Sequence, residues 1–224
     1  MRIWDVNPGF LNDKSLLGEH RELHGIFSIL TNGKKGYSRH PETLRWQNCM
    51  AALVVRHALL VSEMRLRDFN HHSPLSVGNQ EPVWPKIFID SPGRQYKILH
   101  DKYSNKACGR IPLPKNSQEL WAQHKYSVMA RDYKLYQQIG RRVAKNSIAF
   151  DELALGFVSL LQSPPSNKGL QNSLLHMWGY ISKFSDLSPT NLAPHELILE
   201  IQSQSKQHKA QYLLFSTALG ELAL

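Results

Sequence analysis

Apolar residues recur at the spacing of an α-helix in two stretches near the start of the chain. The first stretch runs from Lys14 to Leu30 and is broken by residues 31–36, where two glycines and an asparagine favour a turn. Pro41 suits the first turn of a helix, and apolar positions then line one face up to about Arg67. We therefore predict a first helix and a second, long helix.

The rest of the chain divides into an irregular part and a helical part. Residues 70–115 are rich in Pro, Gly, Ser and His, so we expect a long irregular segment without a long regular element. Helical patterns then resume at residues 118–139, 151–161, 168–181 and 194–219. These patterns predict a mainly α protein with two domains, residues 1–114 and a helical bundle at residues 115–224.

Composition and charge narrow the functional classes. No apolar run approaches the roughly 20 residues that a membrane span needs, so we expect a soluble protein with no membrane partner. Lys and Arg exceed Asp and Glu by 27 − 18 = 9, which favours polyanionic partners such as nucleic acid. The two cysteines, Cys49 and Cys108, lack the spacing of a disulfide framework or a zinc site, which suits a reducing cytoplasm. No export signal is visible, so we expect Met1 to be the native first residue.

The first helix carries the densest set of titratable residues. His20, Arg21, Glu22 and His24 stand between apolar positions, and we expect them to share a polar face that can hold a site. The alternative is an ordinary solvated helix face.

The histidines raise the question of a metal. His20 and His24 have the i, i+4 spacing of a ligand pair, and His71 and His72 are adjacent, but no third ligand follows at a recognisable spacing. We therefore predict no metal site. His57 falls on the apolar face of its helix and is expected to be a core residue.

Several short motifs occur in an order that has a known parallel. They are Met1-Arg2-Ile3, Arg21-Glu22-Leu23, Arg67-Asp68-Phe69-Asn70, and Gly36-Tyr37 followed by His40-Pro41 and Arg45. In this order they resemble the pyrimidine-dimer DNA glycosylase family, whose phage member is called endonuclease V, and its bacterial branch most of all. The resemblance covers roughly residues 1–75 and implies an endonuclease V-like helical domain.

The resemblance also implies a chemistry that needs no metal and no other cofactor. In the family, the α-amine of the first residue attacks the sugar C1′ of a damaged nucleotide to form a Schiff base, and β-elimination then cuts the strand. Here Met1 would supply the amine, because the bulky Arg2 that follows it blocks methionine removal, and Glu22 would be the catalytic carboxylate. An α-amino group has a reference pKa of about 7.7 to 8.0, so an uncharged fraction exists at cellular pH.

The implied partner is damaged double-stranded DNA, in a cytoplasmic, nucleoid-associated location. Lys34, Lys35 and Arg39 lie on a glycine-containing loop where side chains can meet phosphates. Tyr37 and Trp46 are candidate wedges, although core packing is the more common role of such aromatics. The residues expected to contact DNA are Arg2, His20, Arg21, His24, Lys34, Lys35, Tyr37, Arg39, His40 and Arg45.

The second half resembles an uncharacterised bacterial helical domain that occurs alone and joined to other modules, thiouracil desulfurases among them. Its polar residues, His124 and Arg131 for example, suit either a nucleobase site or an interhelical polar network, and we favour the network. Two alternative functions stay open. One is a non-catalytic DNA- or RNA-binding protein, and the other is an accessory protein for modified nucleobase metabolism.

Overall fold

The computed structural model describes all 224 residues and contains helices, turns and loops but no strand. The prediction of a mainly α fold is confirmed. The α-helices are α1 (Asp13–Asn32), α2 (Pro41–Arg45), α3 (Met50–Leu66), α4 (Pro92–Tyr103), α5 (Ser117–Met129), α6 (Tyr133–Ala144), α7 (Phe150–Leu161), α8 (Asn167–Trp178), α9 (Pro194–Gln207), α10 (Gln211–Leu214) and α11 (Ala218–Glu221). Short 3₁₀ turns lie at Pro8–Phe10, Ser182–Phe184 and Pro189–Asn191.

Local signals explain where α1 begins and ends. The Asn12 side chain accepts a hydrogen bond from the Ser15 N–H at 2.9 Å, which satisfies one of the free N–H groups of the first turn. At the other end Gly33 adopts a left-handed conformation, with φ of 59°, and its N–H bonds to the Ile29 carbonyl. The predicted first helix is therefore confirmed.

The single long helix expected from Pro41 to Arg67 is wrong. α2 ends at Arg45, and α3 starts only at Met50. Between them Asn48 has a φ of 66°, a left-handed conformation that no helix interior contains and that Asn tolerates better than most residues. Trp46 is the C-cap residue that follows Arg45, and it is buried. An apolar core residue therefore stands inside the break, and the helical pattern of apolar positions continues through it.

The segment 70–115 is irregular except for α4, so the expectation that it holds no long regular element is wrong. The Ser91 side chain accepts from the Arg94 N–H, and Pro92 fills the first position of the helix, where its missing N–H costs nothing. Tyr96, Leu99 and Tyr103 then bury one face. One of the prolines that made this segment look irregular thus starts a helix.

Helix positions after Ser117 follow the prediction with two exceptions. The stretch 118–139 is divided between α5 and α6, because Asp132 caps a new helix by accepting from the Leu135 N–H. The stretch 194–219 comprises α9, α10 and the start of α11.

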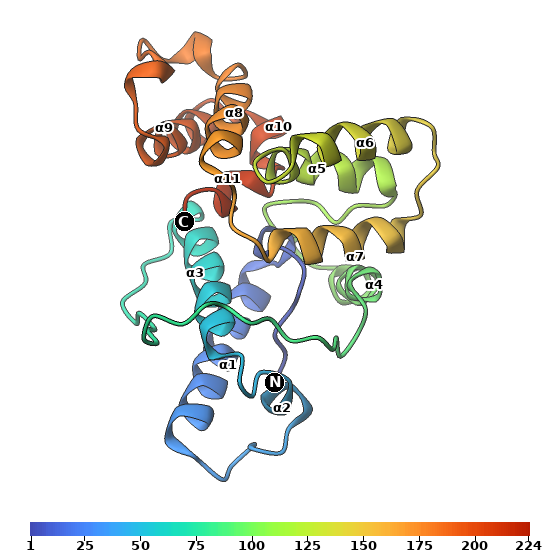
Figure 1. Cartoon of the computed structure of the whole chain (residues 1–224), viewed down its shortest axis with the longest axis vertical. Helices are drawn as coiled ribbons and strands as arrows, with labels where there is room; N and C mark the ends of the chain where they lie inside the picture. The colour runs from blue at the N-terminus through green and yellow to red at the C-terminus, as the bar shows by residue number, and fades with distance from the viewer.

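The helices form three groups (Figure 1). α1, α2 and α3 form the group nearest the N-terminus, α4 to α7 form a second, and α8 to α10 a third, with α11 packed against α3. One hydrophobic core of 27 residues extends from Ile3 to Phe157, and a second of 15 residues joins Leu66 to the C-terminal helices. The first core contains residues from both sides of residue 114, so packing does not separate residues 1–114 from residues 115–224. The boundary between these two domains stays a prediction from the sequence. No helix combines the length and the apolar character that crossing a bilayer requires.

Candidate active site

The first residues of the chain lie along α1 and are held there by two glutamates. The backbone N–H of Trp4 donates to Glu19 Oε1 at 3.2 Å, and the backbone N–H of Arg2 donates to Glu22 Oε2. Alternate N–H groups of an extended segment point the same way, and side chains three apart on a helix are neighbours, so the two contacts share one face of α1. This arrangement brings the Glu22 carboxylate next to the start of the chain.

Glu19 anchors this face, and the sequence analysis did not single it out. The Arg56 guanidinium binds it in a fork, with Nε 2.7 Å from Oε1 and Nη2 3.0 Å from Oε2, and both side chains are buried. Burial raises the pKa of Glu19, and Arg56 and the Trp4 N–H oppose that shift. Arg56 also donates to the Val6 carbonyl at 2.9 Å, which fixes the N-terminal segment a second time.

The terminal amine has a histidine as its neighbour. Met1 N lies 3.3 Å from Nε2 of His40, and it makes no ion pair with a carboxylate. Nδ1 of His40 caps α2 by accepting from the Glu42 N–H at 3.1 Å. Because Nδ1 accepts, a neutral His40 carries its proton on Nε2, and that N–H points at the amine nitrogen.

The polar face expected on α1 is split between two surroundings, so the prediction of one shared face is wrong. Residues two apart on a helix point about 160° away from each other, since each residue turns the helix by about 100°. Glu22 therefore faces the N-terminal segment, whereas His20 and His24 face α3 and contact His57. This placement does not support the prediction that His20 and His24 contact DNA.

The loop between α1 and α2 presents most of the other predicted DNA contacts. Lys35, Tyr37, Arg39 and His40 line an open hollow of about 550 Å³ together with Ser38. Tyr37 is 71% exposed. Lys34 is exposed and bonds only to the Ser28 hydroxyl, and Arg21 is exposed on α1. The hollow thus joins basic side chains to the histidine that contacts the amine.

Two predicted residues have structural roles instead. Arg45 is 3% exposed in its side chain and binds Asp5 and Glu42, so the structure gives it an internal role and does not support the prediction that it contacts DNA. Trp46 is 1% exposed and donates to Glu42 at 3.0 Å, so it is a core residue and not a wedge. Arg2 has protein contacts and is also partly exposed. Its guanidinium binds Asp90 at 2.6 Å and lies over the Trp4 ring, and a quarter of the side chain is exposed.

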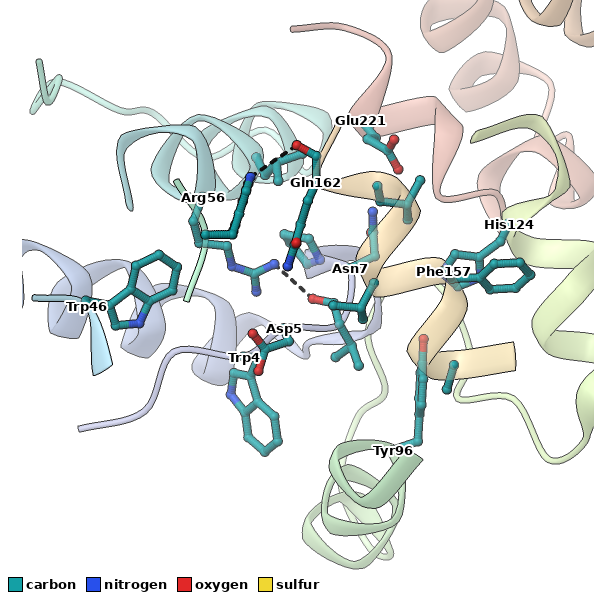
Figure 2. Close-up of a pocket in the computed structure, with 17 residues that line it drawn as sticks. Trp4, Asp5, Asn7, Trp46, Arg56, Tyr96, His124, Phe157, Gln162 and Glu221 are labelled. Carbon is teal, nitrogen blue, oxygen red and sulfur yellow. Dashed lines mark hydrogen bonds between the residues drawn. The ribbon is translucent and has the colours of Figure 1, made fainter. Parts of the chain in front are cut away.

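A second cavity lies where the N-terminal segment meets α3 and α7 (Figure 2). Trp4, Asp5 and Arg56 line one side, and His124 and Phe157 the other. Its free space is about 40 Å³, enough for a few water molecules but not for a nucleotide.

Polar residues of the second half bond to the protein itself. His124 stacks on Phe157 with ring centres 4.7 Å apart and bonds to the Leu120 carbonyl. Arg131 pairs with the buried Glu221 at 2.5 Å. These contacts agree with the interhelical network that the sequence favoured for His124 and Arg131.

Comparison with known proteins finds two stretches of the chain that are similar to known families. Residues 1–77 match the pyrimidine dimer DNA glycosylase family, which supports a glycosylase-like function on DNA. Residues 125–193 match a family described as protein of unknown function (DUF1722). No curated protein and no solved structure gives a significant match. The chain therefore carries a segment similar to the pyrimidine dimer DNA glycosylase family, at residues 1–77, and a segment similar to a family of unknown function, at residues 125–193.

Proposed function

We propose that the protein is a DNA glycosylase with abasic-site lyase activity, acting on damaged pyrimidines such as ultraviolet dimers, or on abasic sites, in double-stranded DNA. The observation that carries the proposal is the hydrogen bond from the Arg2 N–H to the Glu22 carboxylate, one residue away from the Met1 amine. A nucleophilic amine and a carboxylate side by side are the two groups that Schiff-base chemistry on a sugar needs. The family match of residues 1–77 supports the same activity.

In the proposed reaction the uncharged Met1 nitrogen attacks C1′ of the damaged nucleotide. The N–C1′ bond forms, the bond from C1′ to the base breaks, and the base leaves with the electron pair and takes up a proton. The ring oxygen then leaves C1′ as a hydroxyl, which gives an imine between Met1 and the opened sugar. Loss of a C2′ proton and departure of the 3′ phosphate oxygen cut the strand. Glu22 would stabilise the positive charge on the sugar and the imine, and would carry protons between these steps.

His40 and the basic loop would serve this reaction in different ways. The Nε2–H of His40 points at the amine, and a hydrogen bond to the nitrogen lone pair requires the uncharged amine that can attack. Lys34, Lys35 and Arg39 are exposed and would hold backbone phosphates beside the hollow. Tyr37 is exposed enough to stack on a displaced base.

Borohydride trapping tests the proposal. Protein that lacks an N-terminal tag is mixed with a duplex that contains an abasic site or an ultraviolet dimer, and borohydride reduces any imine to a stable adduct seen on a denaturing gel. We expect an adduct with the wild type and a trapping rate lower by about 10²- to 10⁴-fold in Glu22→Gln. Glu81→Gln is the control, because Glu81 is exposed and makes no side-chain bond. No adduct with either duplex would refute the lyase.

A second arm separates the enzyme from a protein that only binds nucleic acid. A Gly-Ser extension in front of Met1 converts the Met1 amine into an amide, which cannot attack, and places the new terminal amine two residues, about 7 Å of extended chain, further from Glu22. The extended protein should form no adduct but should bind the duplex nearly as well as the wild type. An extended protein that still cleaves would show that another group is the nucleophile.

A further inference from the structure

Four histidines from three parts of the chain meet on the face of α1 opposite Glu22. His20 and His24 come from α1, His57 from α3, and His71 from the segment that follows α3. One ring nitrogen from each lies within 4.8 Å of the corresponding nitrogens of the other three. His57 is 33 residues away from His24 and reaches it only through the packing of α3 on α1. The spacing of histidines in the sequence therefore does not reveal His57 as a third ligand.

Two distances within the cluster match those between ligands of one metal ion, and all four donor nitrogens lie within 4.8 Å of one another. Nε2 of His24 lies 3.3 Å from Nε2 of His20 and 3.2 Å from Nε2 of His57. Two nitrogens bound to one tetrahedral zinc ion, at about 2.0–2.1 Å each, stand about 3.3–3.4 Å apart. Each Nε2 has either one proton or one lone pair, so His24 cannot form good hydrogen bonds with both neighbours.

His71 gives independent evidence that the cluster binds something, because one of its buried nitrogens lacks a hydrogen-bond partner. Its Nε2 is buried and has no hydrogen-bond partner in the protein. Its ring centre lies 5.0 Å from those of His20 and His57, and one of its ring nitrogens lies within 4.8 Å of a nitrogen of each of the other three histidines. A buried polar atom without a partner is uncommon in folded proteins, and a bound ion would satisfy it.

The chemistry of the group suits a transition metal. All the donors are imidazoles, which prefer zinc and its neighbours, whereas calcium and magnesium require oxygen ligands. Burial and the neighbouring imidazoles lower the pKa of His20 and His57 to about 4, so these rings are uncharged at neutral pH, as ligands must be. His57 and His71 also line a cavity of about 290 Å³, through which an ion can enter.

We propose that His20, His24, His57 and His71 bind one divalent transition-metal ion, with zinc as the best fit. The ion would tie α1 and the segment after α3 to α3 itself. It would hold in place the helix whose opposite face carries Glu22. The role is therefore structural, and it does not depend on the proposed lyase being correct.

Metal content of the tag-free, full-length protein tests the site directly. The protein is loaded with Zn²⁺, dialysed and measured by elemental analysis, and it should retain one equivalent. His24→Ala and His71→Ala should each lose the bound zinc. His72→Ala is the matched control, because His72 is the adjacent exposed histidine and lies outside the cluster, so it should retain one equivalent.

Two further measurements, one spectroscopic and one thermal, do not depend on the proposed lyase activity. Co²⁺ in the same site should give the intense visible ligand-field bands of a tetrahedral nitrogen site, and these bands should be absent in His24→Ala. Zinc at about 100 times its Kd should raise the Tm of the wild type by about 5–10 °C, and Mg²⁺ should not. The proposal is overturned if the wild type retains no more zinc than His24→Ala, or if His72→Ala loses as much as His71→Ala.

Discussion

The α-amine of Met1 lies 3.3 Å from Nε2 of His40, although 39 residues separate them in the sequence. His40 is fixed as the N-cap of α2, so its position does not depend on the exposed loop that precedes it. The contact therefore connects the terminal nitrogen to a rigid element and to the basic hollow of Lys35, Tyr37 and Arg39. It makes His40 a positioning residue for the amine under the proposed function.

Replacing His40 with Ala should slow the reaction more than it weakens the fold. The lost cap costs about 0.5–2 kcal/mol of stability, whereas the amine loses its partner and its orientation. We expect the borohydride-trapping rate on abasic duplex to fall by about 10²-fold or more and its pH profile to shift, with duplex binding nearly unchanged. His195→Ala, at an exposed position of α9, is the control. An unchanged rate and pH profile would mean that His40 only caps α2.

The Glu19–Arg56 pair should be the most sensitive charge pair in the N-terminal part. Both side chains are buried, so removing one leaves the other charged group without a partner in a dry environment. Arg56→Met should cost about 3–5 kcal/mol in urea unfolding, and it should also release the N-terminal segment that Arg56 holds through Val6. Glu152→Gln breaks the exposed Arg142–Glu152 pair and should cost less than about 1 kcal/mol. Equal losses would show that burial does not decide the effect.

Local signals in the sequence predicted the elements whose causes are local. The apolar spacing, the turn at Gly33 and the two prolines that precede α8, Pro164 and Pro165, identify α1, α7 and α8 to within a few residues. The same signals failed where a stretch of sequence is compatible with both a helix and an irregular segment. The Pro- and Gly-rich composition of residues 70–115 indicated an irregular segment, but Pro92 starts α4, and the apolar pattern hides the break at Asn48.

The candidate site was predictable where it follows a motif and not where it depends on packing. Glu22 and the start of the chain were identified by their resemblance to the motifs of the glycosylase family, and the structure brings them together. Arg45 looked like a basic residue available to phosphate, but buried Asp5 and Glu42 neutralise it. The four-histidine cluster requires the packing of α1 on α3, which no single stretch of sequence contains.

Gly169 should resist substitution because α8 approaches the end of α5 closely there. A Cβ at this position would lie 2.2 Å from the Ala130 carbonyl oxygen, a backbone atom that cannot move aside cheaply. Gly169→Ala should therefore cost about 1–3 kcal/mol in urea unfolding. Gly156→Ala is the matched control: Gly156 is exposed on α7 with nothing within 4 Å, so the change should add about 0.5–1 kcal/mol. A loss at both positions, or at neither, would contradict the close approach.

His124 should make the protein less stable in acid. Burial lowers its pKa from 6.5 to about 4, and the bond to the Leu120 carbonyl opposes that shift only in part. Below pH 6.5 the unfolded chain therefore takes up a proton that the folded chain refuses until about pH 4. The free energy of unfolding should fall by roughly 3 kcal/mol across this window on account of His124 alone, and then level off.

His124→Phe removes the group that takes up the proton and keeps an aromatic ring between Phe10 and Phe157. Urea unfolding from pH 8 to pH 4 should show the two proteins within about 1.5 kcal/mol of each other at pH 8, with the variant gaining on the wild type as the pH falls. His20 and His57 remain in both proteins, so their own acid sensitivity cancels in the difference. His195→Ala should leave the slope as it is in the wild type, because His195 is exposed. Parallel curves for the wild type and His124→Phe would mean that His124 takes up its proton equally in the folded and the unfolded chain.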